Sequence, residues 1–456
     1  MLESINPATE ERIQTYPEHT AAELDEIVRR AEQAFRSWKK VPIVERAHLL
    51  RKAAEVLLKN VEQYAACITQ EMGKPIAQSR AEVEKCATNC IYFADNAERF
   101  LQAEHVATEA QKSYIAFEPL GVVLAIMPWN FPFWQVFRCA APILAAGNTL
   151  VLKHAPTTTG CALAVQEVFR HAGFPEGVYQ TLLIAAPNVP EQVSMLIEHP
   201  SVKAVTLTGS TNAGRFVAAK AGAALKKSVL ELGGSDPYLI LEDADLELAV
   251  ETCANSRCIN TGQSCIAAKR FIVVEKVRKK FEEAFVEKMR AKRIGDPLSD
   301  VDLGPLARND LRHTLHRQVQ ASISKGAKLL LGGAYPEGKG FFYPPTVLSH
   351  VTKGMPAYDE ELFGPVAAII AAKDEAEAIA LANDTCYGLG AAIFTSDCER
   401  GERIAKEIEA GNCFINAMVR SDPRLPFGGI KSSGYGRELS HIGMHEFVNI
   451  KTVFVR

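Results

Sequence analysis

The chain lacks the features that mark secreted, membrane-spanning and nucleic-acid-binding proteins. Its first residues, MLESINPATEE, contain no cationic segment followed by an apolar run, so we expect no secretory signal. The most apolar stretches, such as residues 122–127, are short and end at prolines, and none is long enough to cross a bilayer. The formal net charge of −3 gives no basic excess for binding nucleic acid, and no run of like charges predicts a disordered tail.

The cysteines do not form a disulfide framework. There are eleven, an odd number, and they are spread irregularly over a long chain. Reduced thiols in a cytoplasm are the simpler explanation. Cys86 and Cys90 would share one helical face, but no nearby histidine or cysteine pair completes a metal site, and the eleven histidines show no metal-ligand spacing. We therefore expect no metal, and we expect this cysteine pair to lie in the core.

Length and periodicity predict an α/β protein with two or three domains. Of the 456 residues, 47% are hydrophobic. In the first hundred residues, Thr20 and Glu23 fit a helical capping box, and further helices are predicted at 44–59, 62–71 and 76–100. From about Lys112, apolar strands alternate with helical segments. The strands are predicted at 113–118, 122–127, 149–153, 179–184, 202–208 and 228–232.

The alternation restarts after Gly234, which predicts a second α/β domain. Its strands are predicted at 237–241, 270–274, 367–371, 391–394 and 413–416, with helices near 246–257, 276–292 and 375–383. Short, continuously apolar strands separated by helices indicate parallel sheets buried on both faces. Such sheets bind ligands beyond the carboxyl ends of their strands.

Three loops that follow apolar strands carry candidate functional residues, each with a plain structural alternative. Asn130, in MPWNFP, can donate two hydrogen bonds, but turn chemistry also explains it. The stretch LTGSTNAG, 207–214, opens a helix whose free N–H groups attract anions, although capped helices with a glycine are common. Glu231 ends an apolar strand, where burial would raise its pKa towards that of a general base; a pair with Lys227 is the alternative.

A fourth loop, NTGQSC at 260–265, presents the thiol of Cys265 just before the apolar strand 271–274. A catalytic thiol needs a flexible approach and positive or N–H-rich surroundings, and Gly262 supplies the first of these. Cys253 and Cys258 lie in a helical pattern and are expected in the core. These residues by themselves indicate an α/β enzyme that could have a nucleotide site and a reactive thiol.

Taken in order, the loops resemble the NAD(P)-dependent aldehyde dehydrogenase superfamily. The motifs PWNFP, LTGST, LELGG, NTGQSC, ELFGP and PFGGIKSSGYGRE occur in that family's order, and the resemblance runs from about Asn6 to the C-terminus. Locally, the sequence is similar to succinate-semialdehyde dehydrogenases of the bacterial NAD(P) type. The resemblance implies a Rossmann-type cofactor domain (1–110 and 121–230), an α/β catalytic domain (231–420) and a small β oligomerisation element (111–120 and 435–456). The apolar tail strand would be an exposed edge in a monomer, so a homodimer or homotetramer is expected.

The resemblance also implies residue roles. Cys265 matches the nucleophile, Asn130 matches the oxyanion donor together with the Cys265 N–H, and Glu231 matches the base that activates water. The residues that match cofactor contacts are Trp129, Lys153, Gly209, Ser210, Gly214, Glu361 and Phe363. Many NAD-preferring relatives carry a glutamate three residues after the lysine, where this chain has Pro156. Losing that carboxylate removes repulsion of a 2′-phosphate, and His154 could add a donor, so NADP is expected to be accepted and preferred over NAD.

The resemblance points to succinate semialdehyde as substrate. Arg138 and Ser421 match residues that bind the substrate carboxylate in succinate-semialdehyde dehydrogenases, and Arg420 could assist. The position six before the nucleophile, arginine in some relatives, is Ile259 here. The alternative for Arg138 is an ion pair on the helix surface or between domains, with no role in substrate binding. Other short aliphatic or ω-carboxy aldehydes are alternative substrates. A CoA-acylating dehydrogenase and a non-catalytic structural relative are alternative classes, which the presence of Glu231 and Cys265 disfavours.

Overall fold

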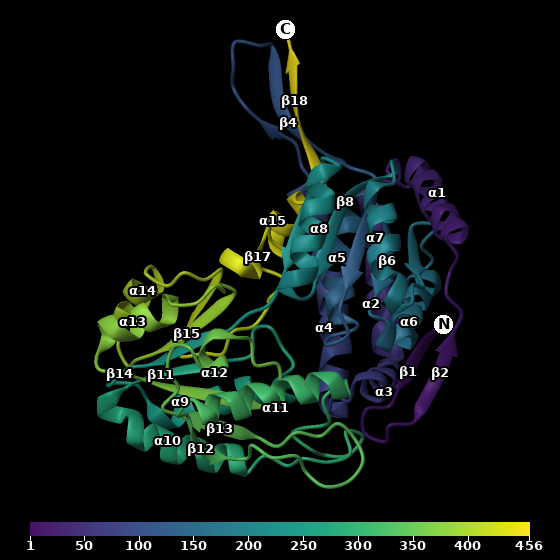
Figure 1. The fold of residues 1–456 in the computed structure, drawn as a ribbon. Coiled ribbons are helices and arrows are strands. Elements are labelled where there is room, and N and C mark those ends of the chain that lie inside the picture. Colours follow the sequence, from purple (N-terminus) through teal and green to yellow (C-terminus); the bar gives the residue numbers. More distant parts are fainter.

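Two helix-covered sheets and a projecting β arm make up the protein, and the computed structural model describes all 456 residues (Figure 1). The first sheet has the strand order β17-β9-β8-β5-β6-β7. Its strands are β5 (Val122–Met127), β6 (Thr149–His154), β7 (Tyr179–Leu182), β8 (Val202–Thr208), β9 (Lys227–Glu231) and β17 (Gly434–Tyr435). All pair in parallel except β17, which runs antiparallel to β9. Every residue of β5 and β6 is buried. The continuously apolar sequence of β5 predicts this burial, whereas β6 also buries Lys153 and His154.

Helices cover both faces of this sheet because successive β5 residues point to opposite sides. Val122, Leu124 and Ile126 pack with α1, α7 and α8, whereas Val123, Ala125 and Met127 pack with the bundle α2–α6. The helices are α1 (Ala21–Trp38), α2 (Ile43–Lys59), α3 (Val61–Met72), α4 (Ile76–Phe100), α5 (Trp134–Ala145), α6 (Thr159–His171), α7 (Val189–Glu198) and α8 (Thr211–Ala223). The capping box predicted at Thr20 and Glu23 is confirmed, and α4 has the predicted bounds.

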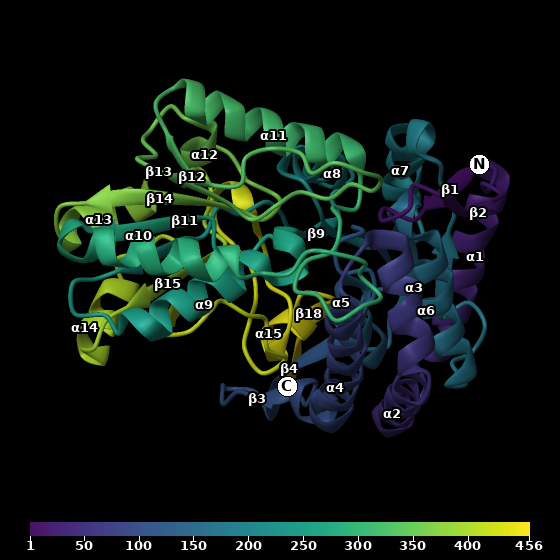
Figure 2. The same ribbon diagram turned by 90° about the horizontal axis from the view of Figure 1, so that it is seen from below.

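The second sheet has seven strands in the order β12-β13-β14-β11-β10-β15-β16. They are β10 (Pro237–Ile240), β11 (Arg270–Val274), β12 (Lys328–Leu331), β13 (Thr346–Ser349), β14 (Val366–Ala372), β15 (Gly390–Phe394) and β16 (Asn412–Ile415). Only β12 pairs antiparallel. Helices α9 and α10 pack on one face, and α11 to α14 on the other (Figure 2). These helices are α9 (Leu246–Cys258), α10 (Glu275–Arg290), α11 (Asn309–Ser324), α12 (Pro356–Asp359), α13 (Glu375–Asn383) and α14 (Cys398–Ala405).

The arm is a three-stranded antiparallel sheet that projects from the body, with the C-terminus near its tip (Figure 1). In it β18 (Val448–Val455) pairs along its whole length with β4 (Lys112–Pro119), and β3 (Glu104–His105) flanks β4. The tail divides differently from the sequence expectation of one unit from 435 to 456, because Tyr435 belongs to the first sheet and the short helix α15 (Ser440–His445) precedes the arm. A hairpin, β1 (Leu2–Ile5) and β2 (Arg12–Tyr16), precedes α1.

The connections of the first sheet reverse direction at β5. The chain continues from β5 to β6 and β7 on one side, and then returns to β8 and β9 on the other. Loops that leave neighbouring strands on opposite sides of such a reversal open a crevice at the strands' carboxyl ends. The loops after β5 and β8 are the ones that contain Asn130 and Ser210. None of the helices combines the length and hydropathy that a membrane span requires.

Candidate active site

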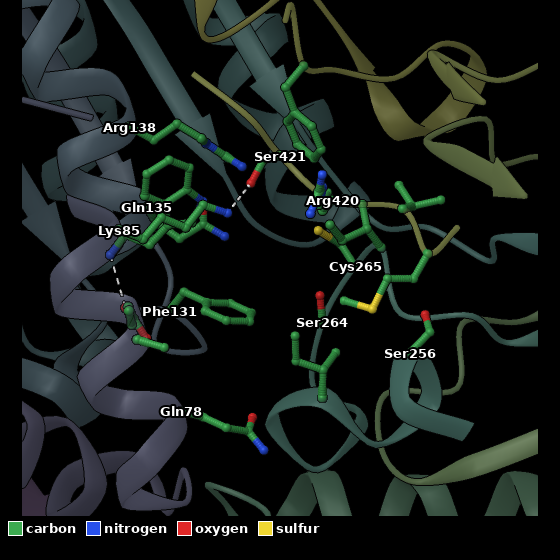
Figure 3. Close-up of a pocket in the computed structure, with 18 residues that line it drawn as sticks. Gln78, Lys85, Phe131, Gln135, Arg138, Ser256, Ser264, Cys265, Arg420 and Ser421 are labelled. Atoms are coloured by element: carbon green, nitrogen blue, oxygen red, sulfur yellow. Dashed lines mark hydrogen bonds between the residues drawn. The ribbon is translucent and has the colours of Figure 1, made fainter. Parts of the chain in front are cut away.

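Two cavities meet at Cys265. The α4–α5 cavity, of about 200 Å³, is bounded by α4, α5, the loop before Cys265 and the segment 418–427 (Figure 3). The switch-point cavity, of about 440 Å³, lies where the loops after β5 and β8 face the second sheet's loops. Cys265 is the only residue that lines both cavities. A group bound in either cavity therefore lies beside the same cysteine.

The backbone before Cys265 is held in an unusual conformation. Asn260, Thr261 and Gly262 have successive φ values of 51°, 54° and 75°, in the left-handed region that costs energy for the first two residues. A Cβ on Gly262 would collide with the backbone of Gly364, so only glycine fits. Asn260 Nδ2 donates to the carbonyls of Asn130 (2.7 Å) and Gln263 (3.1 Å). The surrounding structure thus fixes a strained turn that presents the thiol.

Lys269 fixes the other side of this turn. Its buried ammonium group donates to the carbonyls of Ser264 (3.0 Å), Cys265 (2.8 Å) and Ala267 (3.1 Å). Burial raises the pKa of the Cys265 thiol to about 12, and the positive charges of Arg138 and Lys269 offset only part of that effect. The thiol is therefore protonated at rest, and a bound partner or base has to favour the thiolate.

Asn130 lies next to the thiol loop with one amide hydrogen to spare. Its Nδ2 donates to the carbonyl of Gln263 at 3.1 Å, which orients the amide, and its side chain lines the switch-point cavity beside Cys265. An amide nitrogen has two hydrogens, so the second remains for an oxygen atom bound at the sulfur. Asn130 and Cys265, which the sequence analysis expects to act on one carbonyl group, line the same cavity.

Glu231 is buried behind the two cavities and lines neither of them. Both carboxylate oxygens lack hydrogen-bond partners. Burial raises the pKa of Glu231 well above its usual range, with Arg138 opposing the rise and Glu438 adding to it. A Cβ on Gly428 would lie 2.7 Å from Oε1 of Glu231, so this glycine leaves the carboxylate its space. The alternative pairing with Lys227 is wrong, because Lys227 pairs with Glu446 at 2.9 Å.

Most of the expected cofactor residues line the switch-point cavity. The rings of Trp129 and Phe363 meet edge to face at 5.8 Å, and Gly209, Ser210 and Glu361 complete this set. Ser210 both lines the cavity and caps α8, so the N-terminus of this helix lies at the cavity's edge. Glu361 accepts a hydrogen bond from the Gly234 N–H at 3.0 Å. Gly214 lies inside α8 instead, where a Cβ would collide with Leu232, so its role is packing against the loop after β9.

The two basic residues at the end of β6 differ in their hydrogen bonds. The side chain of Lys153 is buried, and its amine makes no hydrogen bond. Burial lowers the pKa of this amine to about 8. The ring of His154, in contrast, contacts the Pro132 carbonyl (3.0 Å) and the Thr158 hydroxyl (2.9 Å) through its two nitrogens. The expectation that His154 donates to a 2′-phosphate is therefore corrected: it is buried, burial lowers its pKa to about 4, and it has no free donor. Pro156 begins a short, partly exposed 3₁₀ turn (Pro156–Thr158).

The residues expected to bind a carboxylate all line the α4–α5 cavity, together with Ile259. Arg138, however, forms a buried ion pair with Glu438 and donates to the Thr208 hydroxyl at 3.1 Å. Ser421 accepts a hydrogen bond of 2.8 Å from Lys85, and Arg420 is exposed at the cavity's edge. Sequence reasoning missed Lys85, Glu438 and Lys269. The signal for Lys85 was its spacing from Gln78 and Glu82, which puts all three on one face of α4.

One group of potential metal ligands lies outside both cavities. The sulfur atoms of Cys67 and Cys161 are 3.6 Å apart, beside the carboxylate of Glu71. That carboxylate accepts hydrogen bonds from the N–H groups of Gly160 (2.9 Å) and Cys161 (2.8 Å) at the start of α6. These contacts give Glu71 a structural role as a helix cap.

Comparisons with known proteins show which family the chain belongs to. The aldehyde dehydrogenase family model matches residues 1–453, and the chain belongs to that family. It is 50% identical over 452 residues to the succinate semialdehyde dehydrogenase Sad of Escherichia coli, named for NAD(P)+, covering 99% of this chain and 97% of that one. It is 48% identical to a probable NADP(+) succinate-semialdehyde dehydrogenase of Synechocystis, covering 100% and 99%. The crystal structure of a Streptococcus pyogenes succinic semialdehyde dehydrogenase with NADP+ matches with a TM-score of 0.97 and 38% identity, covering 100% of both chains.

Proposed function

We propose that the enzyme oxidises succinate semialdehyde to succinate, with NADP preferred over NAD as the hydride acceptor. The observation that carries the proposal is the position of Cys265 as the only residue common to the two cavities. One cavity has the residues that suit a dinucleotide, and the other has a cationic wall that suits a carboxylate. The names of the E. coli, Synechocystis and S. pyogenes relatives support the choice of substrate and cofactor.

The residues of the switch-point cavity fit a dinucleotide. The start of α8 offers N–H groups for the pyrophosphate, and Phe363 and Glu361 line this cavity with Cys265, where the nicotinamide ribose would be held. Lys153, at the end of β6 and outside this lining, offers an unpaired buried amine for ribose hydroxyls. When bound there, the cofactor supplies the acceptor for a hydride.

The reaction at Cys265 follows from its neighbours. The thiolate attacks the aldehyde carbon and forms a C–S bond, while Asn130 Nδ2 and the Cys265 N–H donate to the carbonyl oxygen as it becomes an oxyanion. Loss of hydride from that carbon leaves a thioester on the sulfur. Glu231 then takes a proton from the water that attacks the thioester, the C–S bond breaks, and the acid is released. Because Glu231 lines neither cavity at rest, its side chain has to turn towards the sulfur for this step.

The substrate assignment predicts a clear preference between two four-carbon aldehydes. We expect kcat/KM for succinate semialdehyde to exceed that for uncharged butanal by about tenfold or more, because a hydrogen bond to a charged group contributes roughly 1.5–3 kcal/mol. Steady-state rates at saturating NADP measure the ratio. Equal efficiencies for the two aldehydes would contradict the proposed substrate.

The proposed preference for NADP rests on Pro156, which lies three residues after Lys153. Pro156→Glu places a carboxylate where a 2′-phosphate would be, and we expect kcat/KM for NADP to fall by about tenfold or more through like-charge repulsion, with a much smaller change for NAD. Pro156→Gln, which has similar size and no charge, is the matched control. A wild-type enzyme that strongly prefers NAD, or equal effects of the two substitutions, would refute this argument.

The assembly and location are also proposed. Strand β18 forms the open edge of the projecting arm and exposes Ile450, Phe454 and Val455. Pairing or packing across a subunit boundary would cover them, which supports a homodimer or homotetramer; light scattering that gave a monomer would exclude both. Because Cys265 has to stay reduced to act, a reducing compartment such as the cytoplasm suits the enzyme.

A further inference from the structure

The wall of the α4–α5 cavity contains a cation without an acidic partner. Lys85 lies on α4, its ammonium group passes 4.2 Å from the centre of the Trp134 ring, and its hydrogen bond goes to the neutral hydroxyl of Ser421. No carboxylate forms an ion pair with it. In Figure 3 the Lys85 and Ser421 side chains meet on the side of the cavity opposite Cys265. A partly buried ammonium group without a counter-ion is costly, so a bound anion would stabilise it.

The neighbouring arginine is in the opposite situation. Arg138 is paired with the buried carboxylate of Glu438, donates to Thr208, and lies 4.9 Å from the centre of the Phe427 ring. Its charge is already balanced within the protein, and binding a substrate carboxylate through the same group would compete with Glu438. Of the two cations on the inner wall, Lys85 therefore has the unsatisfied charge.

We propose that Lys85, with the Ser421 hydroxyl, binds the ω-carboxylate of the substrate, and that Arg138 acts as a positioning residue that holds Glu438. The proposal rests on the proposed function and deepens it, since it names the group that distinguishes a short ω-carboxy aldehyde from an uncharged one. In this arrangement the carboxylate is held by α4 and the 418–427 segment, while the aldehyde carbon lies at Cys265 on the opposite wall. The cavity therefore selects aldehydes whose carboxylate and aldehyde groups are separated by the distance between these two walls.

The assignment has a pH signature that a structural lysine would lack. Burial is the main effect that lowers the pKa of Lys85 to about 8, and the positive charge of Arg138 on α5 adds to it. The acidic groups of Cys86 and Glu82 on α4, and of Asp422 next to Ser421, raise this pKa and offset part of the effect. The free enzyme therefore loses the ammonium charge as pH rises through about 8. The ratio of kcat/KM for succinate semialdehyde to that for butanal should fall above that pH, and taking the ratio cancels titrations that both substrates share, such as that of Cys265.

The test compares Lys85→Met with wild type and with Arg80→Met, an exposed change on the same helix that removes only a surface pair with Glu62. We expect Lys85→Met to lower kcat/KM for succinate semialdehyde by about 100-fold, mainly through KM, and to lower that for butanal far less. The fall of the substrate ratio above pH 8 should disappear. Lys85→Arg should restore part of the preference without that fall, because arginine stays charged.

Other outcomes overturn the inference in distinguishable ways. Equal losses for both aldehydes in a Lys85→Met protein that melts like wild type would give Lys85 a structural role only. A preference that survives Lys85→Met and disappears in Arg138→Met would return the carboxylate site to Arg138. A wild-type ratio near one would refute the proposed substrate itself, in which case Lys85 has no carboxylate to bind.

Discussion

Replacing Cys265 with alanine is expected to lower the rate of aldehyde oxidation by about 1000-fold or more. Without the sulfur no C–S bond forms, and the contacts of the two cavities can only hold substrate and cofactor beside each other. The fold should be unaffected, because the turn is held by the carbonyls of Ser264, Cys265 and Ala267 and not by the thiol. Initial rates of NADPH formation, with a melting curve as a check on folding, measure the effect.

The matched control is Cys398→Ala, which removes an exposed thiol that lines neither cavity. It should retain full activity. Iodoacetamide should inactivate the wild-type protein and Cys398→Ala at the same rate. Peptide mapping should show that loss of activity follows the label on Cys265 and not the label on exposed thiols such as Cys386. A Cys265→Ala protein that oxidised aldehydes at the wild-type rate would end the assignment of this residue as the nucleophile.

The second large effect is expected for Glu231→Gln. The substitution keeps the size of the side chain and removes its ability to accept a proton, so hydrolysis of the thioester should slow by about 100-fold or more. If hydride transfer still proceeds, a burst of about one NADPH per subunit should precede slow turnover. Stopped-flow absorbance measures the burst, and mass spectrometry of the quenched protein should find the acyl group on Cys265.

A chemical rescue separates this role from a loss of structure. Hydroxylamine attacks a thioester without needing a base, so it should restore turnover in Glu231→Gln. Glu176→Gln, a change at an exposed glutamate far from both cavities, is the control and should behave as wild type. Slow turnover with neither a burst nor rescue would mean that Glu231 acts before the thioester forms, and the proposed role in hydrolysis would be wrong.

The strands with continuously apolar sequences were predictable because burial on both faces leaves that signature. Strands β5, β8 and β11 and helices α4 and α13 have the predicted bounds. Helix α11 was not found because only three of its residues, Leu315, Val319 and Ser322, are buried. They share one helical face, but one of them is polar, so too few apolar residues mark that face in the sequence. The two-residue strand β17 could not be found, since only its pairing with β9 makes it a strand.

The residues of the candidate site were also predictable only in part. Asn130 follows the end of β5 and Cys265 lies shortly before β11. The motifs around both residues carry local information about turns, so the sequence named both. Lys85 carries no motif, and its importance comes from which side chains surround it after folding. The ion pair between Arg138 and Glu438 joins α5 to the C-terminal region, and no local pattern records such a pairing. The sequence therefore pointed to the residues proposed to react more directly than to those proposed to hold the far end of the substrate.

The contribution of the C-terminal region to the first sheet has a consequence for how the enzyme matures. Gly434 pairs with Glu231, Gly428 leaves that carboxylate its space, and Glu438 balances Arg138. Gly428, Gly434 and Glu438 all lie beyond β16, the last strand of the second sheet. A nascent chain that ends before residue 428 therefore lacks the surroundings of the proposed base, and we expect it to be inactive until this segment has been made.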